Sequence, residues 1–149
     1  MLNPSEILSL IAIVVSVASF GVAAYTAYQD RSRLRITSVF SAASQYGPAR
    51  ITITLVNMGR RPVILRLLGG TDAAGNWSGT YFKYGTSGLR LGEHERHERS
   101  LINDDAVDFG PEGDPVVYGK LWVEDSLGIR HQVPNSKIHL QRLLGKAAV

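Results

Sequence analysis

Residues 49–57 read ARITITLVN, a stretch in which apolar and polar side chains alternate with a period of two. Ile51, Ile53 and Leu55 fall on one face, and the residues between them fall on the other. This is the pattern of a strand in a sheet that has one face against a core and one face in water. Similar stretches recur after residue 30, and turn residues interrupt them about every ten positions. The pattern predicts an all-β domain with strands at residues 34–41, 49–57, 62–68, 77–84, 98–103, 116–124 and 129–133.

Glycine and proline mark the connections between these strands. Residues 45–48, 57–61 and 126–128 are predicted turns, and Gly69, Gly70 and Gly75 are also interpreted as turn residues because no phosphate-loop sequence follows them. After Pro134, a polar start and four apolar residues predict a short helix over residues 135–144. The predicted organisation is therefore an N-terminal segment at 1–30, a β-sandwich at 31–134 and a helix with a tail at 135–149.

The N-terminal segment has the length and composition of a transmembrane helix. Residues 7–28 carry no charge, and about 22 residues at 1.5 Å each reach roughly 33 Å, enough to cross a hydrocarbon core of about 30 Å. A cleaved signal peptide would have a basic residue before the apolar run, whereas Glu6 stands there. Arg31, Arg33 and Arg35 follow directly, so the positive-inside rule predicts an outside N-terminus and a cytoplasmic domain at the inner membrane.

One face of this helix consists only of small residues, at alternating spacings of three and four. In lipid, helices associate through close backbone approach and polar contacts, so this face is a candidate site for self-association or for a helical membrane partner. The alternative is that the hydroxyls simply bond back to their own helix. The face comprises Ser9, Ala12, Ser16, Ser19, Ala23 and Thr26.

Three motifs together suggest a family. They are the basic residues 31–36 after an apolar helix, the sequence NMGRRPV at 57–63 and the sequence VEDSLG at 123–128. This combination resembles small bacterial inner-membrane proteins that tether an immunoglobulin-like β-sandwich to the bilayer. The resemblance implies that fold but no functional residue. The sequence DPVVY at 114–118 is also similar to the approach to an immunoglobulin F strand, although Lys120 replaces the disulfide cysteine and parity places Val117, Leu121 and Val123 in the core.

The order of the strands sorts the charged loops into two groups. If successive strands reverse direction, Arg60 and Arg61 lie with Arg31, Arg33 and Arg35 beside the membrane, where arginine binds anionic headgroups. The long loop at 103–114 then points away from the membrane. Its acidic residues form a candidate interaction loop, which comprises Asp104, Asp105, Asp108, Glu112 and Asp114.

The densest ionisable cluster is EHERHE at residues 93–98. His94 and His97 would share a face in a helix and bind a metal, but in a strand the same spacing sends them to opposite faces. The strand signals around them favour a charged edge, which also discourages unwanted strand pairing. The acidic loop does not have the spacing of a calcium-binding EF-hand. His131 and His139 have no evident partner in the sequence.

Composition narrows the classes of function. The chain has no cysteine, which excludes disulfides and thiolate chemistry, and a net charge of +3 is too small for a typical nucleic-acid binder. No catalytic, cofactor or substrate motif is present. The first hypothesis is a membrane-anchored, non-enzymatic interaction or scaffold module that oligomerises or binds a membrane protein. The alternative is a metal-dependent enzyme or sensor that uses His94, His97 and the acidic loop.

Overall fold

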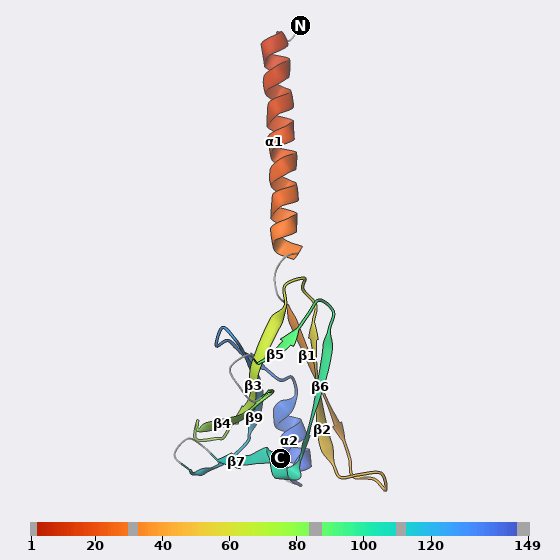
Figure 1. The fold of residues 1–149 in the computed structure, drawn as a ribbon, viewed down its shortest axis with the longest axis vertical. Coiled ribbons are helices and arrows are strands. Elements are labelled where there is room, and N and C mark those ends of the chain that lie inside the picture. Colours follow the sequence, from red (N-terminus) through yellow and green to blue (C-terminus); the bar gives the residue numbers. More distant parts are fainter. Residues whose placement is uncertain (1–2, 30–32, 84–87, 110–112, 146–149) are drawn as a thin grey trace. The chain divides into compact units, whose positions relative to one another are not determined.

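The structure is a computed structural model that describes residues 3–29, 33–83, 88–109 and 113–145. The chain divides into two compact units, Met1–Arg31 and Ser32–Val149. The first unit holds one long helix, and the second holds antiparallel sheets with a short helix near its end (Figure 1).

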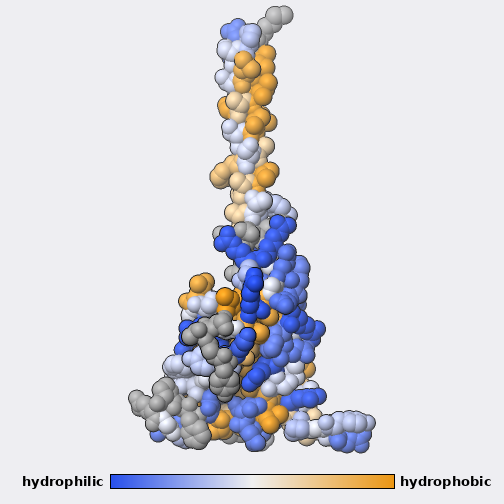
Figure 2. All heavy atoms as spheres, in the orientation of Figure 1, coloured by the Kyte–Doolittle hydropathy of each residue, from blue (hydrophilic) through white to orange (hydrophobic). Residues whose placement is uncertain are grey.

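Helix α1 (Pro4–Gln29) is apolar along most of its length, as the orange surface in Figure 2 shows. Its start is capped by Glu6, whose carboxylate accepts a hydrogen bond of 2.8 Å from the backbone N–H of Asn3. The stretch Pro4–Tyr28 is long and apolar enough to cross a membrane. A membrane-spanning helix is therefore compatible with both the sequence and the structure.

The first sheet of the β domain has three antiparallel strands in the order β1-β2-β6. These strands are β1 (Leu34–Ser41), β2 (Arg50–Asn57) and β6 (Arg96–Ile102). Leu34 pairs with Asn57, and Arg50 pairs with Ile102, so the sheet runs without a register shift from the start of β1 to the end of β6.

The second sheet has five strands, in the order β10-β9-β3-β4 with β5 also paired to β3. Its members are β3 (Val63–Thr71), β4 (Trp77–Tyr81), β5 (Leu89–Leu91), β9 (Lys120–Asp125) and β10 (Arg130–Gln132). A bulge between Leu65 and Leu67 shifts the register of β3 against β9.

Three smaller elements complete the domain. They are the 3₁₀ helix η1 (Asn103–Ala106), the two-stranded sheet of β7 (Val107–Phe109) with β8 (Pro115–Val117), and helix α2 (Ser136–Leu143). Helix α2 packs against β1, β2 and β9. Its Leu140 and Leu143 are buried in the core that the two larger sheets share.

The predicted alternation of β2 is confirmed, because Ile51, Ile53 and Leu55 are fully buried. The predicted single strand at 116–124 is wrong. It is interrupted at Tyr118 and Gly119, so parity cannot be carried across the break, and Val117 is 40% exposed while Val116 and Tyr118 are buried. The two short strands β5 and β7 were not predicted, since three residues are too few to show a period.

Gly69 and Gly70 are strand residues, and their interpretation as a turn is wrong. Both lie in β3, where each leaves room for an aromatic ring of the neighbouring chain segment. A Cβ on Gly69 would lie 2.6 Å from the Trp122 ring, and a Cβ on Gly70 would lie 2.3 Å from the Tyr118 ring. Close approach, not turn geometry, requires glycine at these two positions. Gly75, with φ of 96°, is a turn residue as predicted.

Candidate functional site

Strand β6 carries the second half of the ionisable cluster at residues 93–98 and forms one edge of its sheet. Within the described residues it pairs only with β2, so its other side has no strand partner. Helix α2 packs against β1, the edge strand on the opposite side of this sheet. On β6, Arg96 forms an ion pair with Glu98 two positions away, and the Thr54 hydroxyl donates to the same carboxylate at 3.3 Å. The candidate site is therefore a charged edge strand of seven residues.

The two histidines of the cluster occupy different kinds of structure. His94 is in the turn before β6 with φ of 57°, and its ring nitrogen lies 3.9 Å from the Glu93 carboxylate. His97 is in β6, where its ring meets the Phe82 ring edge-on at 5.7 Å. Burial, together with the nearby Arg99 guanidinium, holds the pKa of His97 below its ordinary value. Within the part of the chain that the structure describes, no three His, Asp or Glu side chains gather as a metal ligand set.

Residues 103–109 of the acidic segment form η1 and β7, so the prediction of a long loop at 103–114 is wrong. Two of its carboxylates form hydrogen bonds within the domain. Asp105 accepts a bond from the Ile102 N–H at 2.9 Å, and Asp108 accepts bonds from the Ser78 hydroxyl at 2.8 Å and the Tyr118 hydroxyl at 3.0 Å. Burial and the Asp108 charge raise the pKa of Tyr118.

The other acidic residues of the candidate interaction loop lie at the surface where the structure describes them. Asp104 and Asp114 are exposed, and Glu112 lies outside the described residues. Asp104, Asp105 and Asp108 also line a cavity of about 130 Å³ together with Arg99. Arg99 of β6 therefore lies beside the acidic segment.

The predicted basic residues lie at the end of the domain where β1 begins. The Met58 N–H donates to the Arg33 carbonyl at 2.6 Å, which joins the turn that carries Arg60 and Arg61 to the start of β1. Arg33, Arg35, Arg60 and Arg61 are all exposed, and Arg60 lies 3.9 Å from the Glu93 carboxylate. Arg31 lies outside the described residues. The strand order correctly predicted that the turn with Arg60 and Arg61 lies at the start of β1, and their position beside a membrane stays a prediction.

Three hydroxyl groups on the small-residue face of α1 form hydrogen bonds within the helix. The hydroxyls of Ser9, Ser16 and Thr26 donate to backbone carbonyls four residues earlier, at 2.7 to 2.9 Å. Because these hydroxyls bond within their own helix, the main way in which this face could bind a second helix is close backbone approach at Ala12, Ser19 and Ala23.

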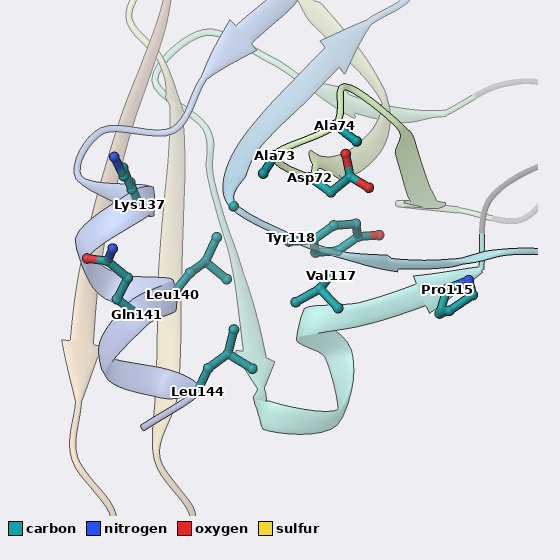
Figure 3. A pocket seen from close by; sticks show the side chains of 11 residues that line it. Asp72, Ala73, Ala74, Pro115, Val117, Tyr118, Lys137, Leu140, Gln141 and Leu144 are labelled. Carbon is teal, nitrogen blue, oxygen red and sulfur yellow. The ribbon is translucent and has the colours of Figure 1, made fainter. Parts of the chain in front are cut away.

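A groove of about 430 Å³ lies between α2 and the segment that joins β8 to β9. Figure 3 shows Leu140 and Leu144 of α2 extending toward Val117, and Lys137 and Gln141 of the same helix also line the groove. Its volume is in the range of small-molecule sites. Asp72, also at the groove, accepts bonds from the backbone N–H and the side-chain amide of Asn76. Among the described residues, no Ser, Cys or His side chain lines the groove. It was not predicted, because its residues come from three separate segments.

Two tryptophans and an arginine cluster on the second sheet. The Trp77 and Trp122 rings lie 5.8 Å apart edge to face, and the Arg130 guanidinium lies 4.6 Å and 4.0 Å from their centroids. The Trp122 ring N–H donates to the Thr71 hydroxyl, and Arg130 also bonds to Glu124 at 3.1 Å. These contacts make the aromatic residues part of the packing across the strands of this sheet.

The two isolated histidines have partners in the structure. His139 lies 3.1 Å from the Ser38 hydroxyl, which joins α2 to β1, and His131 lies 2.9 Å from a carboxylate oxygen of Asp125. The other oxygen of Asp125 accepts bonds from the N–H groups of Leu127 and Ile129. Burial raises the pKa of Asp125, but these hydrogen bonds outweigh burial and hold its pKa below the ordinary value.

The hydrogen bonds of the Asp125 carboxylate should make the stability of the domain depend on pH. A carboxyl whose pKa is lower in the folded chain than in the unfolded chain stabilises the fold above the unfolded pKa, and this stability is lost as the pH falls through the folded pKa. The free energy of unfolding should therefore decline below about pH 4. We expect Asp125→Asn to be less stable than the parent at pH 7, and the two to converge in acid. Urea unfolding at several pH values tests this, with the exposed Asp114→Asn as control. A constant difference between parent and Asp125→Asn would contradict it.

No protein-family model and no curated protein matches this chain. A search of solved structures returns the X-ray structure of Northeast Structural Genomics Consortium target SoR45 at 13% identity. The match covers 70% of this chain and 82% of that chain with a TM-score of 0.29.

Proposed function

We propose that this protein is a membrane-anchored, non-enzymatic interaction module in which α1 holds an immunoglobulin-like β-sandwich at the cytoplasmic face of the inner membrane. In this proposal, β6 binds an extended segment of a membrane-associated protein by strand addition. The observation that carries the proposal is the side of β6 that has no strand partner within the described residues, seven residues long, in a sheet whose opposite edge packs against α2.

The charge pattern of β6 supports a selective partner. Arg96 and Glu98 project from one face of the strand, and opposite charges directly across an antiparallel pair stabilise it while like charges oppose it. A partner strand with a complementary alternation would pair in one register. The charges would at the same time disfavour pairing between unrelated apolar edges.

The topology and the oligomeric state belong to the same proposal. The arginines that follow α1 support an outside N-terminus and a cytoplasmic domain. The small-residue face of α1 supports self-association or packing against a partner helix, through close approach of the two backbones. Two antiparallel sheets that share one core support the immunoglobulin-like arrangement.

Site-specific photocrosslinking in native membranes tests the role of β6. A photoreactive residue at Ser100 in β6 is expected to crosslink a discrete partner, whereas one at the exposed Ser44 is not. Glu98→Pro and Arg99→Pro then test the backbone, because successive residues of a strand direct their N–H groups to opposite edges. Proline at one of these two positions removes a hydrogen bond to β2, and that variant should be destabilised. Proline at the other position removes an N–H group from the free edge, and that variant should fold but lose the crosslink. An unchanged crosslink in the variant that folds would contradict strand addition.

A further inference from the structure

The end of the domain where β1 begins exposes large apolar side chains as well as arginines. The backbone N–H of Ser126 donates to the Ile64 carbonyl at 2.8 Å, which holds the β9–β10 turn beside the start of β3. The β2–β3 turn lies at the same end, since Val63 directly follows it. Leu127 is 79% exposed in the first turn, and Met58 is 46% exposed in the second.

The position of Leu127 is fixed by its turn. The Asp125 carboxylate accepts bonds from the N–H groups of Leu127 and Ile129 at 2.9 Å and 3.0 Å, and Gly128 supplies a φ of 78°. The backbone N–H of Gly128 also donates to the Asp125 carbonyl at 3.0 Å. A single exposed leucine needs no explanation. Here the hydrogen-bonded turn keeps both Leu127 and Ile129 at the surface, and Ile129 is 52% exposed.

The charge at this end complements an anionic surface. Arg33, Arg35, Arg60 and Arg61 are exposed there. Glu93 lies against Arg60, and the Glu95 carboxylate accepts the Gly92 N–H within its own turn, so both nearby acids have interactions in the domain. Guanidinium groups bind phosphate oxygens, and arginines near a bilayer surface are attracted to anionic lipids.

The chain itself limits the distance between this end and the proposed membrane span. β1 begins at Leu34, five positions after Gln29, the last residue of α1. Five residues extend over at most about 17 Å, which is comparable to the depth of the headgroup region and its first water layers. If α1 spans a membrane, a bilayer surface is therefore within reach of this end of the domain.

We propose that this end docks on an anionic phospholipid surface, with Leu127 entering the headgroup region and Arg60 and Arg61 binding lipid phosphates. Met58 and Ile129 would contribute apolar contact at its margin. Apolar side chains at loop tips together with basic residues bind the interface through burial and electrostatic attraction combined. This inference rests on the membrane anchor of the proposed function and is independent of its protein partner.

Lipid quenching of a single fluorescent label tests the proposal on the full chain. The sequence has no cysteine, so Ser126→Cys provides one labelling position beside an unchanged Leu127. The labelled protein is inserted into nanodiscs of phosphatidylglycerol or phosphatidylcholine that carry a shallow spin-labelled quencher. Insertion into discs reports on the anchor, and quenching reports on docking. We expect strong quenching in phosphatidylglycerol that falls at ionic strength near 1 M, where the Debye length is about 3 Å.

Two variants and one control separate docking from chance proximity. Leu127→Ser and the charge reversal Arg60→Glu with Arg61→Glu should each reduce the quenching at least about twofold, because each removes one of the two attractions. A label at Ala43→Cys, in the hairpin between β1 and β2 at the opposite end, should not be quenched. Equal quenching at the two positions, no quenching at position 126 in inserted protein, or quenching that neither variant reduces would overturn the proposal.

Discussion

Replacement of Gly70 by alanine is expected to lower the free energy of unfolding of the β domain by about 3 kcal/mol, an effect typical of overpacking in a filled core. The added Cβ would lie 2.3 Å from two carbons of the Tyr118 ring and 2.9 Å from its Cβ. The ring cannot move away easily, because Tyr118 is 5% exposed and its hydroxyl bonds to Asp108. Its backbone N–H also donates to the Ala106 carbonyl at 3.0 Å.

Gly119→Ala is the matched control for Gly70→Ala. Gly119 directly follows Tyr118, but a Cβ there would lie 3.5 Å from the Thr71 carbonyl oxygen, an ordinary contact. Both tryptophans of the chain, Trp77 and Trp122, are in the second sheet, so their fluorescence in urea follows the unfolding of this domain. Equal midpoints for Gly70→Ala and Gly119→Ala would show that Tyr118 does not fill the space beside Gly70.

The strands that could be predicted from the sequence are those with one buried face and one solvent-exposed face. In β2 the buried and half-buried positions alternate, so the period of two is visible in the residue types. Strand β9 lies in the middle of its sheet, and Leu121, Trp122 and Val123 are all buried in succession. Such a strand has no alternation. A boundary such as the break at Gly119 then cannot be located from periodicity.

The sequence predicted the position of Arg60 and Arg61 within the domain but not the hydrogen bonds of the acidic segment. Strand order alone brought Arg60 and Arg61 to the start of β1, because each connection between antiparallel strands reverses the chain. The hydrogen bonds of Asp108 with Ser78 and Tyr118 join residues that are 30 and 10 positions away, and no local pattern encodes them. The same applies to Asn57, which stands at the junction of a predicted strand and a predicted turn, where no local pattern indicates its hydrogen bonds.

Asn57 connects two turns at the basic end of the domain through its side chain. The residue is fully buried. Its amide nitrogen donates to the carbonyls of Arg61 at 2.8 Å, Gly92 at 3.0 Å and Leu91 at 3.2 Å, and its amide oxygen accepts the Gly59 N–H at 3.0 Å. Asparagine alone offers both donors and an acceptor at this size. Without it, several backbone groups would lose their partners in a buried position.

We expect Asn57→Ala to lower the free energy of unfolding by about 3 kcal/mol, since leaving each buried backbone group unpaired costs about 1 to 3 kcal/mol and water relieves part of that cost. Asn57→Asp should be more destabilising at neutral pH, because a carboxylate cannot donate to the three carbonyls and would be a buried charge beside them. Urea unfolding followed by tryptophan fluorescence measures both.

Asn103→Ala, an exposed asparagine at the other end of the domain, is the control and should change stability by less than about 0.5 kcal/mol. The pH dependence distinguishes the mechanism. Protonation of the carboxyl that Asn57→Asp introduces would remove the buried charge, so this variant should regain stability as the pH falls toward the range where that carboxyl is neutral. If Asn57→Ala were as stable as the parent at pH 7, the three carbonyls would not depend on the amide. The connection between the two turns would then have to come from the backbone bonds of Asn57 with His94 and Glu95.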